Sequence, residues 1–376
     1  MPKERDLSRR GFLKTTGMAA VGGGIVSGSR GRRESGPRED QELKIQSYRT
    51  LGRTGFQVSD IGFGAAAIIN SNVLAVGLDM GINYIDTAEH YMNGQSERAI
   101  GKVLSGRDRG SIFLTTKLNL SFGGGSSKED LKRRFQACLD RLQTDYADCL
   151  MIHMTPRVEE VKHDGFHAAF QELKAEGRAR FLGLSNHGPE HSAWGRVESP
   201  MEQVIGAAAE DGRFDVALFV YNFLQQEQGE RIIDACRDRN MGVTLMKTNP
   251  VAVVDQAVES AAAARARGQL SDAREQLIRD YEAWGRAAEE FKERHGLTSA
   301  TEVRDAAIKF CLSHPGVHTA CPTINTFDGL EGFVSLSGQT LSSTESPMLA
   351  SYQELLGPYY CRHACATCEP SCPHQV

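Results

Sequence analysis

Four residues of different chemical type follow short apolar runs and could together deliver a proton. Asp86 ends "INYID" and precedes Tyr91, Lys117 ends "SIFLTTK", and His153 ends "DCLMIH". A tyrosine phenol can donate a proton, but its ordinary pKa of about 10 makes it a slow acid at neutral pH. A lysine ammonium beside the phenol lowers that pKa, and an aspartate keeps the ammonium charged. A histidine can orient the oxygen that receives the proton. The set predicts protonation of a carbonyl oxygen, the step that accompanies hydride transfer to its carbon.

The elements that would bring these residues together are strands that alternate with helices. Amphipathic stretches such as "SKEDLKRRFQACLDRLQT" separate eight short apolar runs, which are "DIGFGA", "INYID", "SIFLTTK", "DCLMIH", "RFLGLSN", "VALFVYN", "GVTLMK" and "HTACPT". This pattern predicts an α/β fold, a (β/α)₈ TIM barrel preceded by a β-hairpin at "YRTLGRTGFQVS". The carboxyl ends of barrel strands converge on one pocket. Taken singly, Asp86 could cap a helix, Lys117 could lie at the surface and His153 could be a core histidine, so the prediction depends on all four.

A second interpretation comes from "GFGAAA" at 62–67, which fits a Rossmann-like G-x-G-x-x-A pattern. A Rossmann strand would not need a hairpin in front of it, and the following units keep adding strands. We therefore expect this run to be the first barrel strand.

Four cysteines near the end of the chain form the pattern C-x3-C-x2-C-x3-C-P. They are Cys361, Cys365, Cys368 and Cys372. The pattern resembles the bacterial ferredoxin run, with one extra residue in the first gap, and predicts one [4Fe–4S] cluster. A tetrahedral zinc ion and two disulfides are the alternatives. The other five cysteines lie in expected helices and strands and are predicted to be buried.

The amino terminus predicts export. "SRRGFLK" at 8–14, followed by a Gly/Ala-rich run, resembles a twin-arginine signal, which implies carriage of a folded protein by the twin-arginine machinery. The expected location is the periplasm, or the outer side of the membrane if the segment is retained. The formal net charge of -5 and the basic character of the first 34 residues leave an acidic body, which argues against nucleic acid as a partner.

These features divide the chain into segments. We expect a signal at 1–34, a linker at 35–47, the barrel at 48–335 and a cysteine-bearing C-terminal tail at 336–376. Residues 249–296 should be a helical insertion after the seventh strand, either a lid over the barrel mouth or a solvated decoration.

The motifs "DTAEHYMNGQSE", "GLSNH", "YNF" and "HPGVHTACPTINTFDGLEG", together with the hairpin, resemble the aldo-keto reductase family. That resemblance implies a (β/α)₈ barrel that binds NADP(H) or NAD(H) without a Rossmann motif and reversibly reduces carbonyls. It assigns Tyr91 as the proton donor, Lys117 and Asp86 as the residues that tune it, and His153 as the orienting residue. Some members carry a ferredoxin-like tail.

The resemblance also implies cofactor contacts, which match less completely. Ser185 and Asn186 correspond to the pair that binds the nicotinamide carboxamide, and Gly64, Lys247 and Thr323 fall at other expected contacts. A usual glutamine is replaced by Leu218, and 323–328 contains no Lys or Arg that would pair with a 2′-phosphate.

The sequence therefore predicts an exported oxidoreductase that acts on a small carbonyl or alcohol and carries one cluster, which either exchanges electrons with a redox partner or staples the C-terminus. The alternatives are a barrel that has lost nicotinamide turnover and acts through its cluster as an electron-transfer or binding protein, and a Rossmann-type oxidoreductase.

Overall fold

The computed structural model describes residues 42–68, 70–121, 123–188, 199–251 and 272–357, with residues 258, 259, 262, 263, 265 and 266. The predicted signal at 1–34 and the four cysteines at 361–372 lie outside the described residues. No helix in the described ranges combines the length and the apolar character that a membrane span requires.

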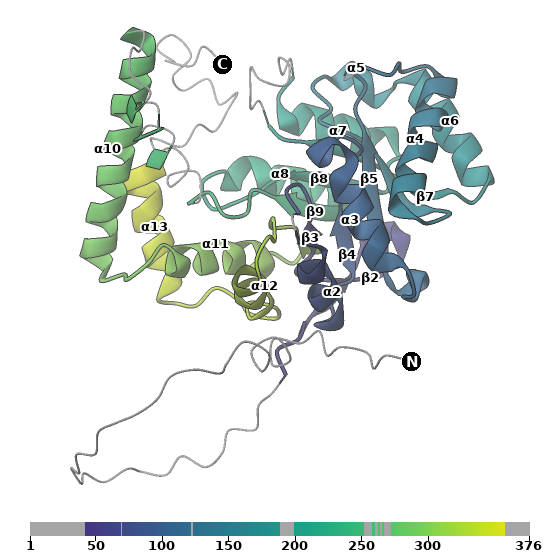
Figure 1. Ribbon diagram of the computed structural model, residues 1–376. Helices are drawn as coiled ribbons and strands as arrows, with labels where there is room; N and C mark the ends of the chain where they lie inside the picture. The colour runs from purple at the N-terminus through teal and green to yellow at the C-terminus, as the bar shows by residue number, and fades with distance from the viewer. Residues whose placement is uncertain are drawn as a thin grey trace, which may run out of the picture. The chain divides into compact units, whose positions relative to one another are not determined.

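Eight parallel strands form the centre of the fold (Figure 1). They pair in chain order from first to last. They are β3 (Phe63–Gly64), β4 (Tyr84–Asp86), β5 (Phe113–Leu118), β6 (Ala147–Ile152), β7 (Ala179–Asn186), β8 (Val216–Val220), β9 (Gly242–Met246) and β10 (Thr319–Ala320). Each coincides with one of the eight apolar runs, so the predicted order of strands is confirmed.

The sheet closes on itself. Parallel bridges join Ile61 to Ala320 and Gly64 to Thr323, which links the first strand to the last. A β-carbon at Gly64 would lie 2.7 Å from the carbonyl oxygen of Pro322, so the seam requires a glycine there. The (β/α)₈ barrel is confirmed, and β3 belongs to it, which excludes a Rossmann-type fold for this region.

The strands are apolar because both of their faces are covered. Every residue of β5, β6, β8 and β9 is buried. The helices of the outer layer are α2 (Ser71–Asp79), α3 (Gln95–Leu104), α4 (Lys128–Leu142), α5 (Val158–Val161), α6 (Asp164–Ala175), α7 (Met201–Asp211), α8 (Gln226–Asp238), α11 (Thr301–Ser313) and α12 (Phe327–Val334), with short 3-10 turns η2 (Tyr91–Gly94) and η3 (Arg109–Ser111).

Helix α4 shows why these segments become helices. Ser127 precedes it and accepts a hydrogen bond from the Asp130 backbone N–H, a favourable N-cap. Its apolar residues, which include Phe135 and Leu139, recur at helical spacing and are buried against the sheet. Gln143 ends the helix in the left-handed conformation.

The predicted hairpin covers the amino-terminal end of the barrel. Strands β1 (Tyr48–Thr50) and β2 (Gln57–Ser59) pair antiparallel and are joined through η1 (Gly52–Thr54). Arg53 donates its backbone N–H to the carbonyl oxygen of Asn240 just before β9. The opposite, carboxyl-terminal end of the strands carries the predicted reactive side chains.

The insertion and the chain end build a second hydrophobic cluster. Helix α10 (Asp272–His295) packs against α13 (Glu345–Leu356), and Figure 1 shows the two side by side. The Tyr352 ring lies 5.1 Å from the Phe291 ring and 5.5 Å from that of Phe223, which follows β8. Within the predicted insertion, residues 272–295 form a helix that packs against α13. Whether the insertion covers the barrel mouth stays a prediction. Residues 345–356 of the segment expected to be a tail form a packed helix.

Candidate active site

Three consecutive strands carry the predicted reactive residues at their carboxyl ends. Asp86 is the last residue of β4, Lys117 is the penultimate residue of β5, and His153 directly follows β6. All three side chains are buried, with exposed fractions of 5%, 0% and 1% respectively. The structure therefore brings the predicted set to one end of the barrel.

Lys117 lies at the centre of the site. Its Nζ atom donates to Asp86 Oδ1 at 2.6 Å and to the carbonyl oxygen of Thr87 at 2.7 Å, and lies 3.5 Å from Tyr91 Oη. Burial acts to lower the pKa of Lys117, but the charge of Asp86 and its contact with Tyr91 raise that pKa overall. Lys117 therefore stays an ammonium at neutral pH.

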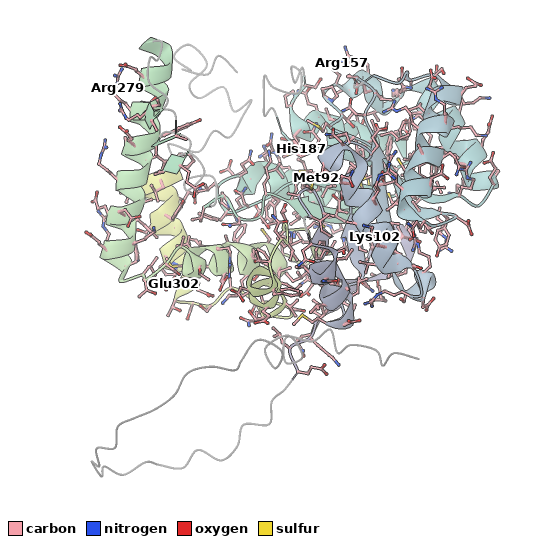
Figure 2. The ribbon with its side chains drawn as sticks, viewed as in Figure 1. Met92, Lys102, Arg157, His187, Arg279 and Glu302 are labelled. Carbon is pink, nitrogen blue, oxygen red and sulfur yellow. The ribbon has the colours of Figure 1, made fainter. Side chains whose placement is uncertain are left out.

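The backbone that follows Tyr91 is unusual. Met92, Asn93 and Gly94 have φ values of 50°, 54° and 78°, so three successive residues are left-handed before α3 begins. The left-handed conformation is uncommon in residues other than glycine and is found at sites where the surroundings impose it. Met92 is exposed, and Figure 2 labels it on this turn. Tyr91, the first residue of this turn, has its hydroxyl 3.5 Å from Lys117 Nζ.

The phenol of Tyr91 is a protonated group at neutral pH. Burial raises the pKa of Tyr91, and the Lys117 ammonium offsets only part of this effect. Lys117 acts to lower the pKa of Tyr91, as expected from the sequence, but the effect of burial is larger and raises that pKa overall. Tyr91 therefore carries the proton that an acid must donate, and the Lys117 ammonium can stabilise the phenolate that this donation leaves.

His153 is a neutral imidazole enclosed by rings. Burial lowers the pKa of His153 well below its ordinary value, and the nearby charge of Lys117 adds to this. Neither ring nitrogen of His153 has a hydrogen-bond partner among the described residues. Because unpaired buried polar atoms are costly, these nitrogens are available to a bound polar group.

Two further histidines adjoin the site and were not predicted from the sequence. The ring of His90 stacks on that of His153 at 4.7 Å, and the ring of His187 lies 6.0 Å from it. Figure 2 labels His187 on the segment after β7. His90 directly precedes Tyr91 and His187 directly follows Asn186 in the sequence. This adjacency to predicted site residues could have indicated that both histidines lie near the site.

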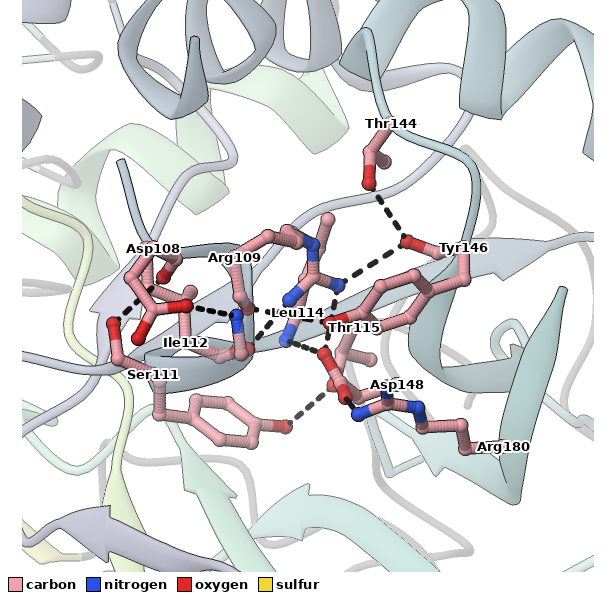
Figure 3. Close-up of polar contacts among 12 residues, drawn as sticks. Asp108, Arg109, Ser111, Ile112, Leu114, Thr115, Thr144, Tyr146, Asp148 and Arg180 are labelled. Atoms are coloured by element: carbon pink, nitrogen blue, oxygen red, sulfur yellow. Dashed lines mark hydrogen bonds and ion pairs between the residues drawn. The ribbon is translucent and has the colours of Figure 1, made fainter. Parts of the chain in front are cut away.

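The opposite end of the barrel carries a different polar cluster, shown in Figure 3. Asp148, near the start of β6, accepts from Arg109 at 2.7 Å, from Arg180 at 3.0 Å and from the Leu114 backbone N–H at 3.0 Å. Both guanidinium groups also lie over the ring of Tyr146, at 4.2 and 4.0 Å. Polar groups at this end of a TIM barrel support the fold, so we assign the cluster to stability.

Comparison with known proteins identifies the family. The sequence model of the aldo/keto reductase family matches residues 68–354. The chain belongs to the aldo/keto reductase family. Among curated aldo/keto reductase relatives, YhdN of Bacillus subtilis is 26% identical over 216 residues, which are 53% of this chain and 60% of that protein. The oxidoreductase YqkF of the same organism is 32% identical over 153 residues, 38% of this chain and 49% of that protein. The chain thus spans about half the length of the curated relatives it matches.

Solved aldo/keto reductases share the fold. AKR11C1 from Bacillus halodurans superposes with a TM-score of 0.59 at 23% identity, over 81% of this chain and 95% of that one. An aldo/keto reductase from Klebsiella pneumoniae, solved with NADP and acetate, superposes with a TM-score of 0.56 at 21% identity, over 83% and 96%.

Two of the residues that the aldo/keto reductase resemblance assigns to the cofactor lie at the end of β7. Ser185 Oγ accepts from the Met154 backbone N–H at 3.0 Å, and Asn186 Nδ2 donates to the carbonyl oxygen of Thr155 at 2.7 Å. These bonds fix both side chains against the loop after β6. Among the described residues, the Ser185 hydroxyl proton and the second Asn186 amide proton have no acceptor, so each side chain can still donate to a ligand.

The other three assigned residues lie around the same end of the barrel. Gly64 and Thr323 face each other across the seam. Lys247 follows β9 in the left-handed conformation at φ 52°, and its Nζ lies 3.4 Å from the carbonyl oxygen of His187. Burial lowers the pKa of Lys247 to about 8. The structure explains Gly64 by barrel closure, so its contact with a cofactor stays a prediction.

The described residues contain no group of three or more His, Cys, Asp and Glu side chains arranged to hold a metal ion. The cysteines at 138, 149, 236, 311 and 321 are free and buried, as expected.

Proposed function

We propose that this aldo/keto reductase family member reversibly reduces a small carbonyl compound with a nicotinamide dinucleotide. One observation carries the proposal, which is the buried Lys117 ammonium held 2.6 Å from Asp86 and 3.5 Å from the Tyr91 hydroxyl, next to a neutral His153. A structural ion pair would not need a tyrosine hydroxyl and a histidine with two unpartnered ring nitrogens beside it.

Each residue then has a role. When bound, the nicotinamide supplies the hydride to the carbonyl carbon. Tyr91 donates its phenolic proton to the carbonyl oxygen, and the ammonium of Lys117 stabilises the phenolate that remains. Asp86 holds the ammonium in place, and His153 donates a ring N–H to the same oxygen and orients it.

The donor set at the end of β7 fits a nicotinamide carboxamide. A hydroxyl and an amide, each with one proton to spare, can bind the carboxamide oxygen. The Klebsiella aldo/keto reductase of the same fold was solved with NADP, which favours that cofactor. The absence of Lys and Arg from 323–328 removes the usual partner of a 2′-phosphate. NADH and NADPH must therefore both be tested.

The test is a titration of the purified protein with each reduced nucleotide, followed by turnover with a panel of aldehydes and ketones. We expect saturable binding, and turnover that Tyr91→Phe lowers by about 100-fold or more with little change in nucleotide affinity. Full activity in Tyr91→Phe would refute the mechanism. Binding without turnover in the wild-type protein would favour the alternative, a barrel that binds the nucleotide but has lost catalysis.

We also propose that the protein is exported folded by the twin-arginine route to the periplasm, or to the outer side of the membrane, and that Cys361, Cys365, Cys368 and Cys372 hold one [4Fe–4S] cluster. The support is the order of residues in "SRRGFLK" and the C-x3-C-x2-C-x3-C-P spacing. Cluster loading before export would account for a signal that carries folded proteins, and a redox partner would exchange electrons with the cluster.

Two measurements test these proposals. Anaerobically purified full-length protein should show brown cluster absorbance with four irons per chain, which Cys368→Ser abolishes. One zinc per chain, or no metal and no free thiol in the tail, would instead favour zinc or disulfides. Replacement of the Arg9–Arg10 pair by lysines should leave the protein inside the cell, and unchanged export would refute the route.

A further inference from the structure

A buried ion pair behind the proton-delivery residues involves a side chain from the outer layer of helices. Arg134, on α4, has an exposed fraction of only 9%. Its guanidinium binds both carboxylate oxygens of Glu89, with Nε 3.1 Å from Oε2 and Nη2 in contact with Oε1. The same Nη2 donates to the carbonyl oxygen of Asn119 at 2.6 Å, and Nη1 donates to that of Gly125 at 2.6 Å.

These contacts join the carboxyl ends of three strands. Glu89 lies two residues before Tyr91, and its backbone N–H donates to the carbonyl oxygen of Lys117 at 3.2 Å. Glu89 Oε1 also accepts from the Asn119 backbone N–H at 3.1 Å. Asn119 in turn donates its side-chain amide to the carbonyl oxygen of His153 at 2.9 Å.

We infer that the Glu89–Arg134–Asn119 cluster positions Tyr91, Lys117 and His153 relative to one another, so that Arg134 is a positioning residue for the proposed carbonyl reduction. This inference rests on the proposed function for its kinetic consequence. The positioning itself does not depend on turnover. Arg134 contacts Glu89 after β4 and Asn119 after β5, and Asn119 contacts the segment after β6.

The geometry explains why arginine is needed there. A planar guanidinium can bind a carboxylate through two nitrogens and still direct its remaining N–H groups at two carbonyl oxygens. A lysine ammonium carries its charge on one nitrogen. It could place a positive charge beside Glu89 but could not make all four hydrogen bonds of the guanidinium. The turn after Tyr91 is left-handed at three residues, so it needs support from its surroundings.

The inference has a kinetic consequence. Tyr91 Oη is already 3.5 Å from Lys117 Nζ, a loose contact, so a small further separation would weaken it. Misplacement of a reacting group by about 1 Å can cost about 100-fold in rate. Loss of the cluster should therefore lower kcat and leave nucleotide affinity, for which we propose the donors at the end of β7, nearly unchanged.

The test compares Arg134→Met and Arg134→Lys with Arg133→Met as a matched control. Arg133 adjoins Arg134 on α4, but its side chain is largely exposed, at 65%, and pairs with Asp130. Arg134→Met leaves the partly buried Glu89, whose side chain is 13% exposed, without its cation, so the double variant Glu89→Gln, Arg134→Met is included to remove that charge. We expect kcat to fall by about 10- to 100-fold in Arg134→Met and in the double variant, by less in Arg134→Lys, and not in Arg133→Met.

A spectroscopic readout separates this inference from the proposed function. Tyrosine labelled at the ring carbon that bears the hydroxyl gives a resonance for Tyr91, which is assigned with Tyr91→Phe. That resonance should shift or broaden in the double variant and stay unchanged in Arg133→Met. A changed resonance in a protein without turnover would support the cluster and refute the proposed function. An unchanged resonance, or a double variant with the stability of the wild type and the same kcat, would overturn the inference.

Discussion

Removal of the Lys117 ammonium gives the sharpest test of the site. In Lys117→Met, the side chain keeps most of its apolar volume but loses its contacts with Asp86, Thr87 and Tyr91. The change has two separable consequences, one for stability and one for catalysis.

The stability consequence comes from Asp86. The Asp86 residue is 5% exposed and loses its cationic partner Lys117, and its other oxygen, Oδ2, already has no partner among the described residues. Breaking a buried pair in this way costs about 3–5 kcal/mol of unfolding free energy. Burial already raises the pKa of Asp86, and loss of Lys117 raises it further. A carboxyl whose folded pKa is raised stabilises the fold below its unfolded pKa and loses that contribution as pH rises through the folded value. The variant should therefore recover stability, relative to the wild type, at acidic pH.

The catalytic consequence comes from Tyr91. An ammonium 3.5 Å from a phenolate, at an effective dielectric constant of about 20, contributes at most about 5 kcal/mol. That limit corresponds to about 3,000-fold in rate, and we expect kcat to fall by about 100- to 1,000-fold after relaxation.

The assay measures chemical unfolding and kcat for Lys117→Met and for the double variant Asp86→Asn, Lys117→Met. The double variant removes both charges and should regain most of the lost stability, but not the rate. Equal stability of the single and double variants, or a kcat within about threefold of the wild type, would refute the assignment of Lys117.

Three further predictions concern stability. Burial lowers the pKa of His318 to about 4, and its Nδ1 accepts from the Val243 backbone N–H at 3.0 Å. A histidine with a lowered pKa in the folded state contributes stability above its unfolded pKa, and that contribution is lost as pH falls through about 4. The wild type should therefore lose about 3 kcal/mol between pH 6.5 and 4, and His318→Gln should lose less, as measured by urea unfolding. Asp148→Ala should cost about 3 kcal/mol by removing the partner of two arginines, with nucleotide affinity unchanged, and a loss of affinity without a loss of stability would contradict its structural role. Gly64→Ala should cost about 1–3 kcal/mol because its β-carbon would lie 2.7 Å from a backbone oxygen, whereas the control Gly206→Ala, with nothing within 4 Å, should be neutral or stabilising in thermal unfolding.

Periodicity was enough to predict the strands. Parallel barrel strands are covered on both faces, so each becomes a short apolar run, as β5 and β6 show. The polar residue that ends such a run lies at the carboxyl end of the barrel, and this position does not depend on the conformation of the loops. This is why Asp86, Lys117 and His153 could be placed in one site from the sequence.

The second hydrophobic cluster could not be predicted in the same way. Helix α13 lies in a segment that looks like a tail, and its apolar residues are buried only because α10 and the loop after β8 meet it. A helix of this length gains most of its stability from such packing, which the local sequence does not reveal.

The sequence by itself determined the family, the barrel and the chemical type of the four proton-delivery residues, because these follow from local patterns of apolar and polar residues. Only the tertiary structure decided how those residues behave. Burial raises the pKa of Tyr91 although the charge of Lys117 acts to lower it, and the extent of burial depends on all the residues that surround the ring. Arg134 lies on α4, 45 positions from Glu89 in the sequence. It contacts Glu89 and Asn119 because the fold places this part of α4 beside the carboxyl ends of the strands. Contacts between residues so distant in the sequence leave no local pattern, and they fix the distances on which the proposed chemistry depends.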